Sequence, residues 1–205
     1  MDCLVLVSRS GLVKHDGQGL NERLDMLLKS NVKVVIKKCD TGVEDEISKL
    51  LECIRLEYGP LKYVAHASGV LRDAMMMNQN NDTFKQVFAP KASGAWFLHK
   101  HTMQDDLSYF IVFSSISSLF GSLGQVNYAA ANSFMDSMVR FRSGIGLKSI
   151  SIQWPAISGV GMAAAMHEKV KINADATIST HAVMGFLRKI LLGNFIKNSV
   201  QAFLP

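Results

Sequence analysis

Apolar residues gather along the chain in short runs separated by longer amphipathic stretches. A short apolar run bounded by small or turn-forming residues is typical of a buried strand. Such runs predict strands at 4–7, 32–36, 63–67, 109–113, 149–153 and 200–204.

The stretches between these runs repeat apolar residues at the spacing of an amphipathic helix. They predict helices over about 20–31, 44–58, 81–101, 126–143 and 184–191. Strands that alternate with helices along a whole chain favour a parallel sheet covered by helices on both faces. The predicted fold is therefore α/β, a Rossmann-like doubly wound parallel sheet.

Two local patterns refine the helices. Thr41-Gly42-Val43-Glu44 has the sequence of a capping box, with a hydroxyl at the cap and a carboxylate three residues later. In the helix that follows residue 125, an apolar face is predicted from Val126, Ala130, Phe134 and Phe141.

Composition indicates one globular domain. The chain has 205 residues, of which 48% are hydrophobic and 19% charged, which is enough for one sizeable core. No internal repeat, linker or low-complexity segment divides it. The formal net charge of +5 is spread along the chain. Scattered basic residues do not predict a nucleic-acid partner, although they are compatible with an anionic cofactor.

Cysteine and histidine spacing argues against disulfides and metals. Cys3, Cys39 and Cys53 are odd in number and form no C-x-x-C, which favours buried free thiols in a reducing compartment. His99 and His101 are two apart and point away from each other on a helix, so no metal site is expected. No apolar run reaches transmembrane length and no leader-like segment is seen, so we expect a cytoplasmic protein without a membrane partner.

Polar residues converge where the predicted strand at 109–113 ends. Ser115 follows that strand, and a glycine-containing loop then leads into the helix that carries Tyr128 and Asn132. These last two are four residues apart and share one helix face. Ligands of α/β sheets bind at the carboxyl ends of the strands, so these three groups form a candidate site.

Taken singly, each residue has an ordinary structural explanation, such as a serine-rich loop or a half-buried tyrosine. The combination from Ser114 to Asn132, S-S-x-x-x-x-x-G-x-x-G-Q-x-x-Y-A-A-A-N, is more specific. It resembles the active-site segment of ketoreductase domains of polyketide synthases and animal-type fatty acid synthases, which are members of the short-chain dehydrogenase/reductase superfamily.

The resemblance implies a catalytic tetrad. The segment 90–99, P-K-A-S-G-A-W-F-L-H, is similar to the family's lysine motif and assigns the catalytic lysine to Lys91. Lys91 precedes Tyr128 by 37 residues, Ser115 precedes it by 13 and Asn132 follows it by four, which are the family's intervals. Lysine and asparagine are interchanged relative to ordinary short-chain dehydrogenases.

The resemblance also implies the role of each group. Tyr128 would donate a proton to the developing alkoxide, and Lys91 would lower the pKa of the phenol while holding the cofactor ribose. Ser115 would donate a hydrogen bond to the substrate carbonyl oxygen. Asn132 would position a water or the lysine for proton resupply. The alternative for Lys91 is a side chain that reaches from an apolar helix to solvent.

NADPH is the cofactor that the resemblance implies. The implied cofactor-binding residues are Arg9, Asp40, Ala67, Ser68, Gly69, Lys91, Tyr128, Pro155 and Ala156. Arg9 would clamp the 2′-phosphate with its guanidinium fork, and Asp40 would accept the adenine amino group. Arg9 is otherwise a solvated loop residue, Asp40 a turn residue, and Gly69 a site of close backbone packing.

The implied substrate is a β-ketoacyl thioester on the phosphopantetheine of an acyl carrier protein, with neighbouring synthase domains as partners. Asp73, Gln125 and Asn127 are implied to orient it, and Asp73 and Asn127 lean towards the D-configured alcohol. Asp73 is equally explained as a loop carboxylate. Small residues over 159–165 would suit a lid over the substrate.

The chain departs from this family at its N-terminus, because the resemblance begins at the family's second strand. The first strand and its G-x-G-x-x-G turn are not found, and Gly17-Gln18-Gly19 lacks the third glycine. We therefore expect residues 1–205 to be a single ketoreductase domain, incomplete at its N-terminus, from a larger polypeptide. The alternatives are an inactive structural domain of such a synthase, or a free-standing reductase of small carbonyl metabolites. Asn132 disfavours the last of these, because a lysine is expected there.

Overall fold

The strands of the protein are parallel, as the sequence predicts. The computed structural model describes residues 3–12, 18–159, 177–192 and 200–202. Its main sheet has the order β3–β4–β5–β8, formed by Tyr63–His66, Tyr109–Ser115, Ser149–Trp154 and Val200–Ala202. A separate pair joins β1 (Cys3–Ser8) to β2 (Lys33–Lys38), and a short pair joins β6 (Ala156–Ile157) to β7 (Thr177–Ile178). Every pairing is parallel, which confirms the α/β fold class.

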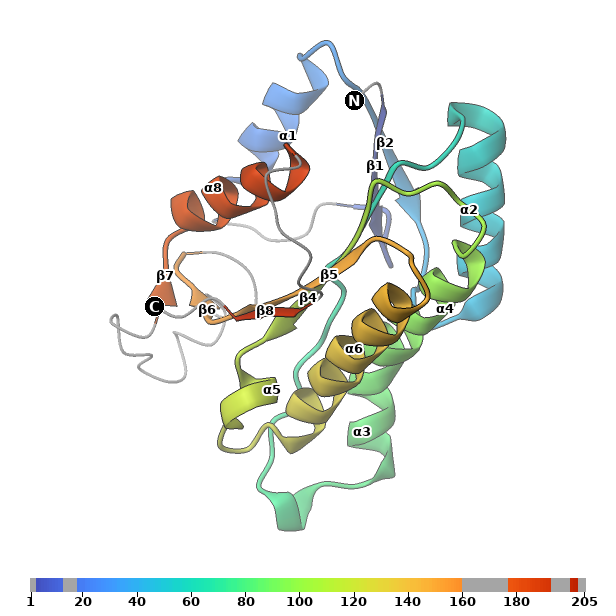
Figure 1. Ribbon diagram of the computed structural model, residues 1–205. Helices are drawn as coiled ribbons and strands as arrows, with labels where there is room; N and C mark the ends of the chain where they lie inside the picture. The colour runs from blue at the N-terminus through green and yellow to red at the C-terminus, as the bar shows by residue number, and fades with distance from the viewer. Residues whose placement is uncertain (1–2, 13–17, 160–176, 193–199, 203–205) are drawn as a thin grey trace.

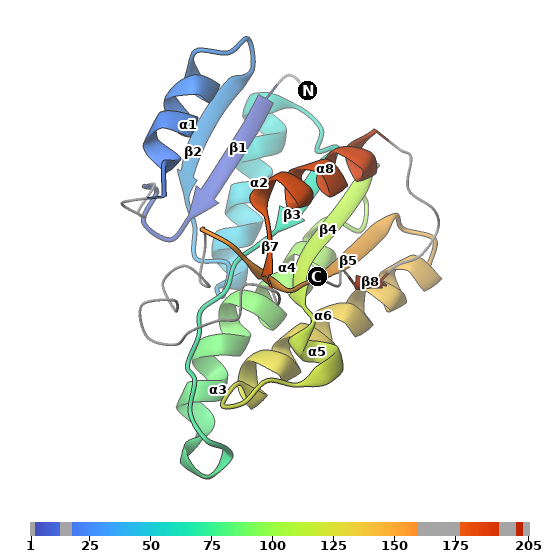
Figure 2. The same ribbon diagram turned by 90° about the vertical axis from the view of Figure 1, so that its left-hand side faces the viewer.

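Helices cover the sheets from two sides (Figure 1). On one side lie α2 (Glu44–Tyr58), α3 (Asn81–Phe88), α4 (Gly94–His101) and α6 (Val126–Gly144). On the other lie α1 (Leu20–Leu28) and α8 (Thr180–Leu191), which face the viewer in Figure 2. Among the described residues, the two largest of three buried apolar clusters lie between these helices and the main sheet. The first joins β3 and β4 to α2, α4 and α6, and the second joins β4 and β5 to α8.

The strand pair β1–β2 is not hydrogen-bonded to the main sheet. Among the described strands, β1 pairs with β2 alone and β3 pairs with β4 alone. Figure 2 shows the two sheets as separate groups of arrows. One edge of β1 and one edge of β3 therefore keep backbone groups that no described strand satisfies.

The predicted helix over 81–101 is present but changes its winding in the middle. The turn η2 (Ala89–Ser93) is π-helical and lies between α3 and α4. Pro90 lies inside this turn, and proline has no N–H to donate to the helix ladder. Pro90 and Lys91 are both buried there. The wide turn therefore accommodates the proline and carries Lys91 into the interior.

The capping box predicted at Thr41–Glu44 is wrong. Helix α2 begins at Glu44 after Val43, which makes no side-chain cap. The hydroxyl of Thr41 donates instead to the carbonyl oxygen of Pro90, at 3.4 Å. A capping box does form at the start of α3, where the Asn80 side chain accepts from the backbone N–H of Thr83.

The apolar face predicted for α6 is also wrong. Val126, Phe134 and Phe141 are exposed, with 36–53% of their surface open to solvent. The buried face of α6 carries four polar residues beside its alanine, methionines and valine, namely Asn127, Asn132, Asp136 and Arg142. This helix therefore packs with a polar stripe against the sheet, and each polar group needs a partner there.

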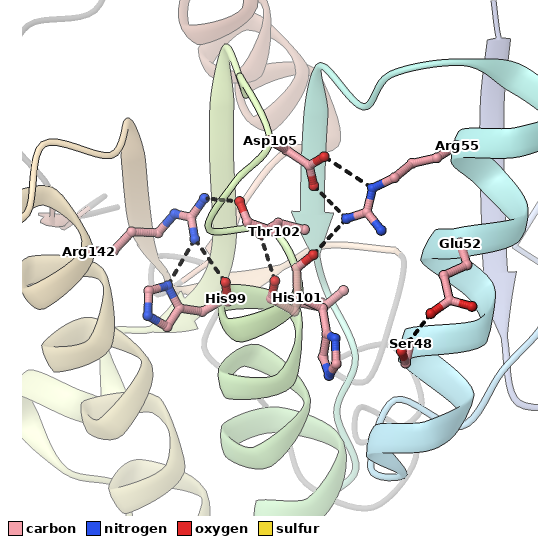
Figure 3. A network of polar contacts seen from close by, with 9 residues as sticks. Ser48, Glu52, Arg55, His99, His101, Thr102, Asp105 and Arg142 are labelled. Carbon is pink, nitrogen blue, oxygen red and sulfur yellow. Dashed lines mark hydrogen bonds and ion pairs between the residues drawn. The ribbon is translucent and has the colours of Figure 1, made fainter.

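Arg142 is the largest fully buried side chain of this stripe (Figure 3). Its Nη1 donates to Nδ1 of His99 at 2.9 Å and its Nη2 to the carbonyl oxygen of Thr102 at 3.3 Å. Its guanidinium carbon lies 4.5 Å from the centroid of the Phe110 ring. Arg142 thus satisfies carbonyl groups at the end of α4 and ties that helix to α6.

A second arginine joins α2 to the same region. Arg55 holds the carboxylate of Asp105 with two hydrogen bonds, at 2.7 and 3.1 Å. It also donates to the carbonyl oxygen of His101 at 2.6 Å (Figure 3). The ends of α2, α4 and α6 are therefore linked by two planar cations, which hold the helical layer together.

The three cysteines are free thiols, but only Cys39 is buried. Burial raises the pKa of this thiol to about 11. Within the described ranges, none of the helices combines the length and the apolar character that crossing a membrane requires.

Candidate active site

The candidate site lies at the carboxyl ends of β3 and β4. Ser115 is the last residue of β4, and Ala67 to Gly69 follow β3. Tyr128 and Asn132 come from the first turns of α6, and Lys91 comes from η2. Parallel strands present their carboxyl ends at one edge of a sheet, so these segments meet there.

Lys91 is buried and points into this meeting point. Only 2% of its surface is exposed. Its Nζ donates to the carbonyl oxygen of Phe113 at 3.2 Å and lies 4.9 Å from the centroid of the Tyr128 ring. A side chain at Gly69 would place its Cβ 3.4–3.6 Å from the end of the lysine. The alternative in which Lys91 extends to solvent is therefore wrong.

Burial sets the charge of Lys91. Desolvation lowers its pKa to about 7, and the negative charge of Asp136 acts in the opposite direction. Near neutral pH the lysine therefore exchanges its proton readily, unlike a surface lysine.

The Tyr128 phenol does not follow the expected direction. We expected Lys91 to lower its pKa, but burial of the phenol raises that pKa above its usual value. The neighbouring Asn132 and Ser115 side chains act in the lowering direction, and the charge of Asp73 acts in the raising direction. Desolvation outweighs the polar neighbours because an ionised phenol loses most of its hydration at this depth.

Asn132 is fully buried beside Tyr128. Its Nδ2 donates to the carbonyl oxygen of Tyr128 at 2.9 Å. Its Oδ1 has no hydrogen-bond partner among the described residues. A buried oxygen without a protein partner is a ready acceptor for a water or a ligand.

Ser115 lies in a tight turn at the end of β4. Its Oγ accepts a hydrogen bond from the backbone N–H of Ser117 at 3.2 Å, and its hydroxyl also acts on the Tyr128 phenol, whose pKa it lowers. Lys91, Ser115 and Asn132 thus lie around the Tyr128 side chain, the set of residues that the resemblance implies. Their catalytic roles remain a prediction.

The residues predicted to orient the substrate lie beside this group, and each makes different contacts there. Gln125 donates to the carboxylate of Asp73 at 3.0 Å, which links the loop before α6 to the segment after β3. Asn127 is fully buried and donates to the carbonyl oxygen of Arg72 at 2.9 Å and to Oε1 of Gln79 at 3.1 Å. Its amide therefore anchors the segment that carries Asp73.

The residues predicted to bind the cofactor divide into two groups. Ser68 and Gly69 follow β3, where Gly69 lies against Lys91, and Pro155 and Ala156 follow β5. Arg9 is exposed at the end of β1 and lines an open cavity of about 950 Å³. Other lining residues come from β1, α1 and β2, and none of the four residues around the phenol is among them.

Arg23 of α1 also lines this cavity, and sequence reasoning did not single it out. The sequence feature that could have pointed to Arg23 is its position three residues after Leu20 on a predicted amphipathic helix. Asp40, in contrast, is engaged locally, because its Oδ1 accepts from the backbone N–H of Gly42 at 2.9 Å. The lid predicted over 159–165 lies outside the described residues beyond Gly159.

His66 is a second group that sequence reasoning missed. It ends β3, is 2% exposed, and its Nε2 donates to the carbonyl oxygen of Lys91 at 3.0 Å. Burial lowers the pKa of this histidine to about 4, so it is neutral at neutral pH. The described residues contain no cluster of histidine, cysteine, aspartate or glutamate that could hold a metal ion.

Comparison with known proteins agrees with this geometry. The profile of the KR domain family matches residues 1–159. The chain is 39% identical over 143 residues to mellein synthase of Phaeosphaeria nodorum, and 36% identical over 151 residues to polyketide synthase GfsB of Streptomyces halstedii. These alignments cover 69% and 74% of this chain, but only 8% and 3% of those synthases.

Among solved structures, A-type ketoreductases from a modular polyketide synthase superpose with a TM-score of 0.84 at 30% identity. The superposition covers 98% of this chain and 42% of that one. The chain thus spans a small part of each synthase and less than half of the ketoreductase chain.

Proposed function

The chain belongs to the KR domain family, the ketoreductases of polyketide synthases within the short-chain dehydrogenase/reductase superfamily, and from this premise we propose that it reduces a β-ketoacyl thioester to the β-hydroxyacyl thioester with NADPH. The thioester would be carried by an acyl carrier protein, and neighbouring synthase domains would share the polypeptide. The proposal includes a cytoplasmic location. The gathering of Lys91, Ser115 and Asn132 around the Tyr128 phenol is the observation that supports it.

Tyr128 is the proposed proton donor. A buried phenol with a raised pKa stays protonated at neutral pH and has a proton to give. The O–H of Ser115 would stabilise the carbonyl oxygen as it gains negative charge. The unpartnered Oδ1 of Asn132 would hold a water that returns a proton to the phenol.

Lys91 would assist both the donation of the proton by Tyr128 and its later replacement. Its ammonium lies over the Tyr128 ring and stabilises negative charge as it develops on the phenol oxygen. A pKa of about 7 also lets it pass a proton on at neutral pH. A lysine in proton resupply was implied by the resemblance, but its lowered pKa was not expected from the sequence.

The residues present fit two ends of a dinucleotide. NADPH supplies the hydride when bound. Lys91 and the close approach of Gly69 would hold the nicotinamide ribose. Arg9 and Arg23 would place two guanidinium groups around the 2′-phosphate, in the cavity at the end of β1. The sequence offers no G-x-G-x-x-G turn for the pyrophosphate between them.

We also propose that residues 1–205 form one domain that is completed by a further segment. The unjoined edges of β1 and β3 support this, because both strands run parallel and both lack a partner on the facing side among the described strands. A strand placed between them would join the two sheets into one.

The test is the variant Tyr128→Phe in the polypeptide that contains the complete domain. We expect ketoacyl reduction to fall by about 10²–10⁴-fold, while NADPH affinity from fluorescence titration stays unchanged. Tyr63→Phe, at the opposite end of β3, is the matched control and should keep full activity. A Tyr128→Phe protein with near wild-type turnover would refute the assignment.

The second candidate is an inactive structural domain of a synthase. The unjoined sheets and the sequence without a glycine-rich turn favour it. Titration of NADPH into the chain alone and into the longer polypeptide separates the two. Binding and turnover in the longer polypeptide support the reductase, and binding in neither supports the structural domain. Comparing free ketones with carrier-bound thioesters tests the free-standing reductase.

A further inference from the structure

Asp136 is a buried carboxylate directly behind the candidate site. It is 3% exposed and lies on α6, four residues after Asn132 and eight after Tyr128. Residues at this spacing follow one another along one helix face. The described part of the chain offers it no salt bridge to a cation. A buried carboxylate without an ion pair needs hydrogen-bond donors to remain in place.

Three neutral donors surround Asp136. Ser151 donates to its Oδ1 at 2.5 Å, and Gln153 donates to its Oδ2 at 2.7 Å. Ser151 and Gln153 alternate along β5 and so point to the same face of the sheet, towards α6. The third donor is the hydroxyl of Ser118, at 2.7 Å from Oδ2. Because Gln153 offers only N–H groups here, this arrangement suits the ionised carboxylate.

Ser118 connects the carboxylate to the turn of Ser115. Its single hydroxyl proton is shared between two acceptors, because Oγ lies 2.8 Å from the carbonyl oxygen of Ser115 and 2.7 Å from Oδ2 of Asp136. It also accepts from Gln153 at 2.9 Å. The backbone of Ser115 is therefore one side chain away from the carboxylate. A shift of the carboxylate would move the turn that presents the Ser115 hydroxyl.

The charge of Asp136 also acts on the buried cation of the site. Lys91 is contacted by His66 of β3 through its backbone, by the Phe113 carbonyl of β4, and by the Tyr128 ring of α6. His66 is neutral and Tyr128 protonated near pH 7, so neither supplies negative charge. Among the described residues, Asp136 supplies the charge whose effect opposes the desolvation of Lys91.

We propose that Asp136 is a positioning residue of this site, whose carboxylate anchors the Ser115 turn through Ser118 and supplies the counter-charge to the ammonium of Lys91. The anchoring part stands on the contacts of Asp136 and Ser118, and the counter-charge part adds the effect of Asp136 on the pKa of Lys91. Its consequence for reduction rests on the function proposed above. Two separate measurements therefore test it.

The first measurement is the titration of Lys91 in the full chain, followed by the NMR signal of its ¹³Cε and assigned with Lys91→Met. Asp136→Asn removes the charge and keeps the volume, and should lower the titration midpoint by about one pH unit. Ser118→Ala breaks the link to Ser115 but keeps the charge, and should leave the midpoint unchanged. An unchanged midpoint in Asp136→Asn, or an equal shift in Ser118→Ala, overturns the counter-charge.

The double variant Asp136→Asn with Gln153→Glu exchanges donor and acceptor across the same hydrogen bond. It keeps one negative charge in the cluster and protects the test against misfolding of the single variant. We expect it to restore the Lys91 midpoint. A folded double variant with a midpoint displaced by a full unit contradicts the proposal.

The second measurement is kinetic, in the polypeptide with the complete domain. Ser118→Ala and Asp136→Asn should both lower kcat several-fold with little change in KM, and only Asp136→Asn should also shift the pH profile. If the wild-type polypeptide shows no reduction at all, the proposed function fails while the NMR titration still decides the role of Asp136. Unchanged kcat in both variants overturns the anchoring role.

Discussion

The Nζ atom of Lys91 lies 4.9 Å from the centroid of the Tyr128 ring. The two side chains come from residues 37 positions apart, one in a π-helical turn and the other in the first turns of α6. Lys91 is buried and Tyr128 partly buried, and loss of hydration is the largest influence on both pKa values, lowering that of the lysine and raising that of the phenol. At neutral pH the phenol therefore keeps its proton, while the lysine is near its titration midpoint.

The buried charge of Lys91 predicts a stability that depends on pH. The folded pKa of about 7 is below the ordinary value, so the unfolded chain binds the proton more tightly between pH 7 and about 10.5. Wild-type stability therefore rises with pH across this window. Lys91→Met, which carries no charge, should be more stable than wild type at pH 6 by up to about 5 kcal/mol.

This difference should shrink towards zero near pH 10. Urea denaturation of both proteins at pH 6 and pH 10 measures it. An equal difference at the two pH values would show that packing, not charge, separates Lys91→Met from wild type.

His66 predicts a second pH dependence, at the acid side. Its folded pKa of about 4 is below the ordinary value of about 6.5, so the unfolded chain binds the proton more tightly between these two values. Stability is therefore lost as pH falls from 6.5 to 4. The loss from this residue should be about 3 kcal/mol.

The variant His66→Gln keeps an N–H that can donate to the Lys91 carbonyl oxygen but does not titrate. We expect it to lack this part of the acid dependence. Denaturation curves at pH 6.5 and 4.5 compare the two proteins, with His101→Gln, a partly exposed histidine beside Glu44, as control. A wild-type acid dependence in His66→Gln would exclude His66 as its source.

Arg142 predicts a large stability effect at a site far from the proposed chemistry. Arg142→Met keeps a long apolar stem over the Phe110 ring but leaves His99 Nδ1 and the carbonyl oxygens of His99 and Thr102 without their donor. Unsatisfied buried acceptors should lower the free energy of unfolding by about 2–5 kcal/mol. Arg140→Met, on the exposed side of α6, should change it by less than about 0.5 kcal/mol. Equal effects in the two variants would contradict the network in Figure 3.

Gly94 predicts a steric effect where α4 begins. A Cβ at this position would lie 2.9 Å from the carbonyl oxygen of Thr41 and 3.2 Å from Cε1 of His66. Gly94→Ala should therefore destabilise the fold by about 1–3 kcal/mol. Gly185→Ala, in α8 with open space around it, should stabilise by up to about 1 kcal/mol. Thermal melting of both variants measures the contrast, and a stabilised Gly94→Ala would contradict it.

The elements that could be predicted from sequence are those that apolar residues define. Each predicted strand and helix is present because a buried strand or helix face needs apolar side chains at a fixed period. Tyr128, Asn132 and Ser115 were expected to lie together because Ser115 follows a predicted strand, and the other two share one face of the helix that comes next. The direction of the Tyr128 pKa was mistaken, because burial depth cannot be read from spacing, and the catalytic roles of these residues stay predictions.

The polar face of α6 could not be predicted in the same way. Asn127, Asp136 and Arg142 are buried because partners on β5, α4 and the segment after β3 satisfy them. Those partners are distant in sequence, so a search for apolar periodicity assigned the face to Val126, Phe134 and Phe141. The π-helical turn around Pro90 was also missed. Apolar residues recur through 81–101 as in one regular helix, and this pattern does not show that the helix widens at a proline, which usually ends a helix.

The unjoined edges of β1 and β3 have a consequence for handling the chain alone. An uncovered edge of a parallel strand presents a row of N–H and C=O groups that can pair with any extended peptide. Two molecules that meet at high concentration can satisfy each other's edges by intermolecular strand pairing. Self-association of the chain should therefore grow with concentration, and a short peptide that occupies the edge should suppress it.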